Sequence, residues 1–200
     1  MARSAGPKCR MCRREGIKLY LKGPRCETEK CAVSKRPQAP GQHGTGRKNV
    51  SEYGKQLREK QKAKRIYGIL EKQFGNYVKK ALKAKGVTGE VLLQELETRL
   101  DNMVYRSGFA LSRPQARQFI RQGLFTVNDR NVNIPSQQVR VGDVIKPVSF
   151  EKIQLREGFV MPEWLEANVK DKFVKFSRLP KEGDTQERID IPLIIEFYSR

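Results

Sequence analysis

The sequence predicts an α+β protein in which a mostly helical part is combined with a small antiparallel sheet. Apolar residues recur at helical spacing over positions 51–108, whereas they alternate with polar residues over 125–145. All four cysteines stand within residues 1–31, where little helical periodicity is visible. These observations predict helices, a small sheet and a separate N-terminal segment along a chain of 200 residues.

Three helices are expected in the first half of the chain. Ser51 is a typical helix N-cap, and the pattern after it predicts a helix over 51–67. Apolar residues three and four positions apart predict a second helix over 69–84 and a third over 88–107. Gly108 is expected to end the third helix, because glycine commonly terminates helices.

A short fourth helix and a sheet are expected next. The helix occupies about residues 112–123, and the alternating pattern after it predicts a hairpin that turns at Asn128 and Asp129. The apolar residues over 139–145 suggest one or two further strands. The apolar, β-branched end of the chain, residues 189–200, predicts a strand docked on a core.

The net charge of +19 is far larger than solubility requires. The surplus is +10 over residues 1–50, +6 over 51–100 and +4 over 101–150, while 151–200 carry −1. This distribution predicts that a polyanion binds the first three quarters of the chain, and RNA or DNA is the first candidate. An acidic membrane surface is the alternative, although no run of 18 apolar residues could span a bilayer.

The four cysteines have the spacing of a metal site, Cys9-x2-Cys12-x13-Cys26-x4-Cys31. Two close pairs across a medium gap can supply four thiolates to a tetrahedral zinc ion, which would be structural because no coordination position stays open. An iron–sulfur cluster uses the same thiolates, and two disulfides are the remaining alternative, which a cytosolic chain disfavours. Neighbouring cations would offset the thiolate charge and lower the thiol pKa values.

The first predicted helix carries a basic stripe of four cations spaced three, four and three residues apart: Lys55, Arg58, Lys62 and Arg65. Side chains at this spacing share one helix face and repel one another unless phosphates lie between them. Only Glu52 and Glu59 stand near enough in sequence to pair with them, so the stripe predicts an RNA-binding face. A solvated face with local ion pairs is the alternative. Tyr53 is a candidate for stacking on a base or for packing.

The fourth predicted helix is the next candidate RNA-binding element. Its N-terminal N–H groups and positive dipole attract a phosphate, and arginine side chains can hold neighbouring phosphates. Ser112 and Gln115 also have the spacing of a capping box. The candidate RNA-binding residues of this helix are Ser112, Arg113, Gln115, Arg117, Gln118 and Arg121.

The N-terminal stretch is the most basic part of the chain, and residues 32–49 are rich in Pro and Gly. That composition is typical of an extended arm that its partner orders. We expect RNA contacts from the cations of both stretches, which are Arg3, Lys8, Arg10, Arg13, Arg14, Arg25, Lys35, Arg36, Arg47 and Lys48.

Longer motifs carry a resemblance to a known family. The segments GPKCRMCRREGIKLYLKG, QAPGQHG, YGKQLREKQKAKRIYGILEKQF, LETRLDNMVYRSGFALSRPQARQ and IEFYSR resemble the small-subunit ribosomal protein S4 family of bacterial or organellar type, in its cysteine-containing variant. The order Val127-Asn128, Val132-Asn133-Ile134 and Gly142-Asp143 resembles the S4-type RNA-binding domain. The similarity covers nearly the whole chain except residues 150–188.

The resemblance implies a helical domain into which an S4-type RNA-binding domain, with two helices and a small antiparallel sheet, is inserted. The expected order is a four-cysteine metal-binding segment and basic arm over 1–49, the helical domain over 50–97 and the RNA-binding domain over 98–150. An irregular or partly helical connection follows over 151–188. Residues 189–200 then rejoin the helical domain.

The resemblance also implies a structural constituent of the small ribosomal subunit in the cytoplasm. Family members bind the 5′ domain of the small-subunit ribosomal RNA, nucleate assembly and contact neighbouring ribosomal proteins. They lie near the channel through which the messenger enters and influence accuracy, and some repress their own messenger RNA. The likeness places His43 against RNA, with a solvated loop residue as the alternative. The family's hairpin turn usually reads Asn-Gly, so Asn128-Asp129 suggests a different turn type.

Two other function classes share some of these features. RNA-modifying enzymes and some synthetases use the same RNA-binding domain, but residues 151–200 are too few for a catalytic domain and no nucleotide-binding glycine motif appears. A small RNA binder of stalled ribosomes or heat shock would not need residues 1–90. We therefore expect no enzymatic activity, no small-molecule substrate and no membrane partner.

Overall fold

The computed structural model is an α+β protein, as the sequence predicts. Among the residues it describes, it contains eight α-helices and one five-stranded antiparallel sheet. Contacts divide the chain into two compact units, a first unit of residues 1–89 with 187–200 and a second unit of residues 90–186. The described residues are 6–46, 50–149, 153, 156, 159–168, 172–181, 183–185 and 189–199.

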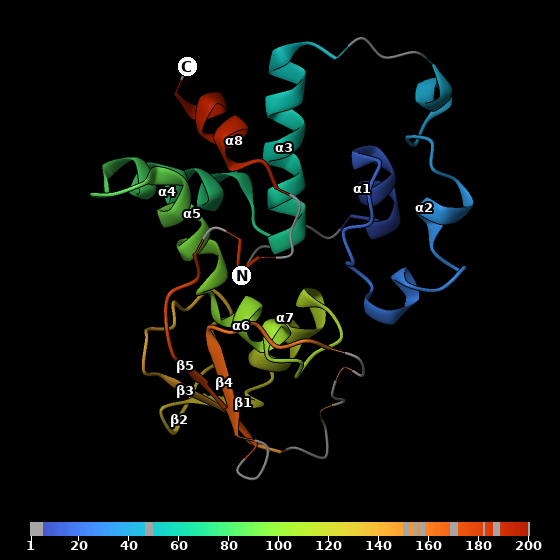
Figure 1. Ribbon diagram of the computed structural model, residues 1–200. Helices are drawn as coiled ribbons and strands as arrows, with labels where there is room; N and C mark the ends of the chain where they lie inside the picture. The colour runs from blue at the N-terminus through green and yellow to red at the C-terminus, as the bar shows by residue number, and fades with distance from the viewer. Residues whose placement is uncertain are drawn as a thin grey trace. The chain divides into compact units, whose positions relative to one another are not determined.

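Residues 6–46 of the first unit, here called the cysteine segment, form short helices joined by turns (Figure 1). In order these are α1 (Lys8–Glu15), η1 (Gly23–Cys26), α2 (Ala32–Lys35) and η2 (Gln42–Thr45). The first of them ends at Gly16, whose φ of 74° is a left-handed conformation that glycine adopts readily. Leu19, Leu21 and three of the four cysteines are buried, so this segment has only a very small apolar core.

Two longer helices follow, α3 (Glu52–Tyr67) and α4 (Glu71–Lys83), close to the predicted bounds. The Ser51 hydroxyl accepts a hydrogen bond from the Gly54 N–H at 3.2 Å, which confirms the predicted N-cap. Gly68, with φ 65°, ends α3. The chain can therefore turn sharply between the two helices.

The predicted strand at the C-terminus is wrong, because the segment forms helix α8 (Ile191–Tyr198). The Asp190 carboxylate caps it by accepting a hydrogen bond from the Leu193 N–H at 3.3 Å. A proline in its first turn costs no helical hydrogen bond. Short apolar runs do not distinguish a strand from a buried helix by period alone. Packing against α3, visible in Figure 1, favours the helix over a strand. It also places this segment in the first unit.

The single helix predicted over 88–107 is interrupted. It forms α5 (Thr88–Glu97) and α6 (Leu100–Arg106), separated by Thr98 and Arg99. At the break the Thr98 carbonyl accepts a hydrogen bond from the N–H of Val139 at 2.9 Å. At this point backbone hydrogen bonds to a loop distant in the sequence replace helical hydrogen bonds. The spacing of apolar residues does not predict this break.

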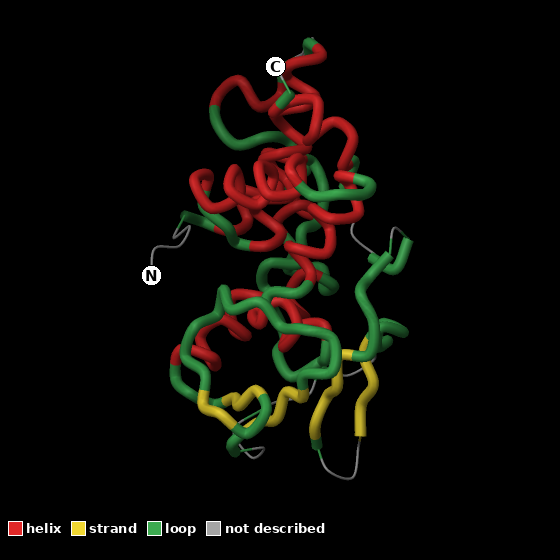
Figure 2. Tube along the Cα trace, turned by 90° about the vertical axis from the view of Figure 1, so that its left-hand side faces the viewer, coloured by secondary structure: helices red, strands yellow, loops and turns green. Residues whose placement is uncertain are grey.

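The second unit pairs helices with a sheet. Helix α7 (Arg113–Arg121) precedes strands β1 (Phe125–Val127), β2 (Arg130–Asn131), β3 (Val144–Pro147), β4 (Leu165–Asn168) and β5 (Phe173–Phe176). The strand order is β2-β1-β3-β5-β4. Figure 2 draws the strands of this sheet in yellow. Opposing residues such as Val127, Ile145 and Val174 are buried on one face of the sheet. The core of the second unit lies on that face, together with apolar residues of α6 and α7.

The β1–β2 turn keeps left-handed geometry although it lacks the usual glycine. Asn128 and Asp129 have φ values of 50° and 61°, as a type I′ turn requires. The Asn128 side chain donates to the Asp143 carboxylate at 2.8 Å and accepts from the Val144 N–H at 2.9 Å. The suggestion of a different turn type is therefore wrong, because side-chain hydrogen bonds stabilise a conformation that Asn and Asp tolerate.

The connection expected to be irregular or partly helical over 151–188 instead contributes two strands to the sheet. Val174 and Phe176 of β5 are buried, whereas Lys175 between them is exposed. Trp164 just before β4 is fully buried and meets the Phe176 ring at 5.7 Å between centroids. In the sequence, the alternation of apolar and charged residues over 173–176 is too short to predict a strand. None of the described helices is long and apolar enough to cross a bilayer.

Candidate metal pocket and RNA-binding surfaces

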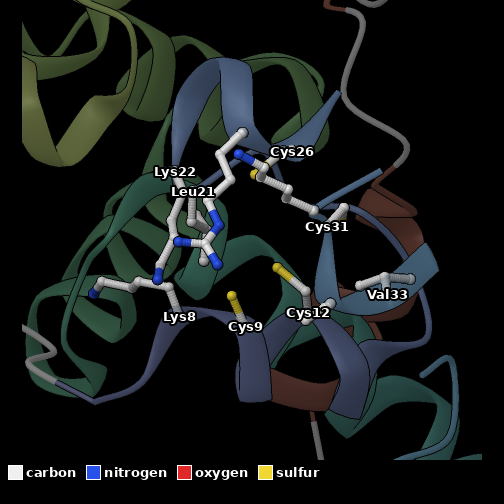
Figure 3. A pocket seen from close by; sticks show the side chains of 11 residues that line it. Lys8, Cys9, Cys12, Leu21, Lys22, Cys26, Cys31 and Val33 are labelled. Atoms are coloured by element: carbon white, nitrogen blue, oxygen red, sulfur yellow. The ribbon is translucent and has the colours of Figure 1, made fainter. Parts of the chain in front are cut away.

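The structure brings the four cysteines of the cysteine segment to one pocket (Figure 3). Cys9 and Cys12 come from α1, while Cys26 ends η1 and Cys31 precedes α2. The pocket measures about 20 Å³, which is room for roughly one water-sized ligand. All four thiols are free, so the two-disulfide alternative is not formed.

The thiols share this pocket without adopting a coordination geometry. In the part of the chain that the structure describes, no three His, Cys, Asp or Glu side chains are close enough together to hold a metal ion as they are placed. Lysine and arginine side chains also line the pocket, including Lys8, Lys22 and Arg25. Four thiolates around a divalent ion would carry a net negative charge, and the lysine and arginine side chains that line the pocket would offset it.

The cysteine pKa values follow burial more than the nearby cations. Burial raises the pKa of Cys12 and of Cys26, and neighbouring cysteines add to the rise. For Cys31, burial acts in the same direction, but hydrogen bonds from the backbone of Ser34 and Val33 outweigh it and lower its pKa. The lowering expected from neighbouring cations is therefore wrong for Cys12 and Cys26.

The predicted basic stripe lies along α3, and all four of its cations form ion pairs. Lys55 pairs with Glu52 at 2.6 Å and Lys62 with Glu59 at 2.5 Å, as the sequence allowed. Arg58 and Arg65 both pair with Glu15, the last residue of α1. The inference that only Glu52 and Glu59 could compensate the stripe is wrong, because a third carboxylate arrives from the cysteine segment.

Glu15 connects the cysteine segment to α3. Its side chain is 2% exposed, and its Oε1 lies 3.4 Å from Arg58 Nη1. Burial raises the pKa of Glu15, and the guanidinium groups of Arg65 and Arg58 counter part of that rise. Two of the four stripe cations therefore have a structural task, and their contact with RNA stays a prediction.

Helix α7 divides its predicted RNA-binding residues between core and surface. Arg113 is buried, donates to Asn102 Oδ1 at 2.8 Å and lies 4.5 Å above the Tyr105 ring. Arg117 donates to the Asp101 carboxylate at 3.2 Å. Gln118 and Arg121 are exposed. Only Gln118 and Arg121 therefore expose their side chains fully to a ligand.

The predicted capping box at the start of α7 is formed only in part. Ser112 occupies the N-cap position, but its side chain makes no capping hydrogen bond. The Gln115 side chain reaches back and accepts from the Leu111 N–H at 2.8 Å, one residue before the expected donor. Ser112 is buried, so its hydroxyl is not presented at the surface.

The remaining candidates lie mostly on the surface of the first unit. Arg13 donates to the Gln38 carbonyl at 2.9 Å and thereby connects α1 to the arm, and Lys8 is half-buried. Tyr53 is 50% exposed, with its ring centroid 5.5 Å from that of Phe197. The exposed candidates are Arg10, Arg14, Arg25, Lys35, Arg36 and His43. Arg3, Arg47 and Lys48 lie outside the described residues.

Comparisons with known proteins agree over the whole chain. The "Ribosomal protein S4/S9 N-terminal domain" family matches residues 3–97, and the "S4 domain" family matches residues 98–145. Relatives described as "Small ribosomal subunit protein uS4" include those of Thermodesulfovibrio yellowstonii (53% identical), Heliobacterium modesticaldum (55%) and Solidesulfovibrio magneticus (54%). Each match covers 100% of this chain and of the relative. The chain is therefore a member of the uS4 family.

Proposed function

We propose that the protein is a structural constituent of the small ribosomal subunit and binds its ribosomal RNA directly. The observation that carries this proposal is the full-length match to uS4 proteins in a chain of net charge +19. A charge of that size is stabilised by phosphates, and the matching relatives are described as small-subunit proteins. They are not described as enzymes, in agreement with a non-catalytic role.

The exposed cations of the cysteine segment form one surface that we assign to RNA, and those of α7 form a second. Arg10 and Arg14 are exposed on α1, and Arg121 is exposed at the end of α7. Arginine can hold phosphate with two parallel hydrogen bonds. The internally paired Arg58, Arg65 and Arg113 would support these surfaces by fixing the helices.

The family resemblance supports a finer proposal. The RNA partner would be the 5′ domain of the small-subunit ribosomal RNA, bound early enough to nucleate assembly alongside neighbouring ribosomal proteins. The protein would work in the cytoplasm near the channel through which the messenger enters, and would influence accuracy there. Contact with messenger RNA belongs to the same proposal.

The test is binding of the purified chain to small-subunit ribosomal RNA fragments over a series of salt concentrations. We expect preferential binding to a 5′-domain fragment over a large-subunit fragment of equal length, with an affinity that falls steeply as salt increases. Co-sedimentation with small subunits should follow. Equal binding to both RNAs together with absence from small subunits would overturn the proposal.

We also propose that Cys9, Cys12, Cys26 and Cys31 hold a single structural zinc ion. Four free thiols that line one pocket form a suitable donor set for zinc. An iron–sulfur cluster would use the same four thiolates and is the alternative to zinc. The ion would fold a segment whose own core is very small.

Metal analysis of the purified protein checks this proposal. We expect about one zinc per chain and no visible absorbance from iron–sulfur charge transfer. Cys12→Ser should lose the zinc, whereas Glu29→Gln, at an exposed position of the same segment, should retain it. Iron in place of zinc would assign the cluster instead, and absence of both metals would overturn the site.

A further inference from the structure

Helix α4 carries a row of exposed cations opposite its buried face. Phe74, Val78 and Ala81 are fully buried and mark the side that packs in the first unit. Lys72, Asn76, Lys79 and Lys83, here called the α4 stripe, are spaced four, three and four residues apart. At about 100° per residue, this spacing aligns them on one line along the helix. All four are exposed.

The α4 stripe has no internal charge compensation among the residues that the structure describes. No Asp or Glu occurs from Lys72 to Gly89, although five lysines do. The described ion pairs of this region all involve Glu71, whose carboxylate serves Lys60 and Lys64 of α3 at 2.8 and 2.6 Å. Lys72, Lys79 and Lys83 take part in no ion pair with a described carboxylate.

The contrast with α3 is the central observation. Every cation of the α3 basic stripe has a carboxylate within 4.0 Å, so the field of that helix is largely neutralised inside the protein. Lys79 and Lys83 stand four positions apart and repel each other, and Lys72 adds a further uncompensated charge two turns away on the same face, which disfavours the free protein. External anions placed between them would relieve that repulsion.

The geometry of the α4 stripe fits an extended polyanion. Lys72 and Lys83 are eleven positions apart, which corresponds to about 16 Å along a helix. Lysine is a mobile point charge that binds phosphate without reading bases, and Asn76 can add a neutral hydrogen-bond donor. A surface of this kind follows a nucleic-acid backbone and positions it without selecting a sequence.

We infer that the α4 stripe is an additional RNA-binding surface, which holds consecutive phosphates of the ribosomal RNA backbone. This inference rests on the proposed function, because it assumes that RNA is the bound polyanion. The RNA contact is assigned to lysines of α4 that form no ion pair among the described residues. The cations of α3, in contrast, are paired with carboxylates of the protein itself.

The test compares two triple variants of the full chain on the same small-subunit RNA fragment. Substitution of Lys72→Gln, Lys79→Gln and Lys83→Gln removes the charges but keeps good helix formers at exposed positions, so the variant should fold and be at least as stable as the wild type in thermal unfolding. The matched control is Lys72→Arg, Lys79→Arg and Lys83→Arg, which keeps every charge. Binding of all three proteins is measured from low to high salt.

We expect the slope of log affinity against log salt to become shallower by about 2 to 3 in the glutamine variant, at about 0.7 to 0.9 per phosphate contact. The arginine variant should keep the wild-type slope. A wild-type slope in the glutamine variant would overturn the inference while leaving the proposed function intact. Failure of the wild-type protein itself to bind would instead count against the proposed function. An equal loss in both variants would also overturn the inference, since charge would not be the cause.

Discussion

Glu97 and Arg106 form a two-point ion pair in the second unit, with Arg106 Nε 3.0 Å from Oε2 and Nη2 2.9 Å from Oε1. Their side chains are 0% and 8% exposed. The Asn102 side chain donates to the same carboxylate at 2.7 Å. Arg106 therefore stabilises the end of α5 against α6 and adds nothing to the charge offered to RNA.

Substitution of Arg106→Met should destabilise the protein by about 3 to 5 kcal/mol, because Glu97 would be left as a buried charge with its main partner removed. Urea unfolding of the purified variant measures this loss. Arg121→Met, at an exposed position on α7, is the matched control and should change stability by less than about 0.5 kcal/mol. Equal effects of the two substitutions would contradict the structural role.

Substitution of Glu15→Gln should loosen the cysteine segment from α3. Arg58 and Arg65 would lose their shared carboxylate, and we expect a loss of about 2 kcal/mol, less than for a fully buried pair because both arginines are partly exposed. Hydrogen exchange of the α1 amides should accelerate more than that of α4. Glu29→Gln on the exposed part of the same segment is the control, and equal acceleration in both variants would contradict the docking role.

Stability should depend on Glu71 at acid pH. Burial acts to raise the pKa of Glu71, but hydrogen bonds from Lys60, Lys64 and Tyr198 outweigh it and lower the value to about 2. Because the folded pKa is depressed, this stabilisation is present above the ordinary value of about 4.5 and is lost as the pH falls towards 2.

Substitution of Glu71→Gln should therefore flatten the decline of stability between pH 5 and pH 2. We expect a difference of about 1 kcal/mol, reduced by solvent screening because half of the side chain is exposed. Urea unfolding at a series of pH values measures it. Glu52→Gln, an exposed acid at the start of α3, is the control, and a similar flattening there would argue against this assignment.

Two arginines of α7 should separate stability from RNA binding. Arg121→Ala should make the salt dependence of RNA affinity shallower by about 0.7 to 0.9, with stability nearly unchanged. Arg113→Ala should cost about 1 to 3 kcal/mol of stability, because it removes a buried hydrogen bond to Asn102 and a contact with the Tyr105 ring. Salt-dependent binding and urea unfolding of both variants test the division, which identical behaviour in both assays would refute.

The sequence by itself determined the features that depend on neighbours along the chain. Helical period located α3, α4 and α7, alternation located the first hairpin, and the capping residue Ser51 marked where α3 begins. Net charge is a sum over residues, so its excess and its gradient along the chain needed no coordinates. The cysteine spacing indicated four thiols near one another, and the fold places them at one pocket.

Only the tertiary structure decided which charges are compensated and which elements the ambiguous segments form. Glu15 reaches Arg58 across 43 positions, and Arg113 is buried against Asn102, so helical spacing could not show that either arginine is engaged internally. The C-terminal apolar run forms a helix because it packs against α3. Residues 173–176 form a strand because they pair with the edge of β3, and residues 165–168 pair in turn with them. Ion pairing and burial depend on distances in space, which separations along the chain do not determine.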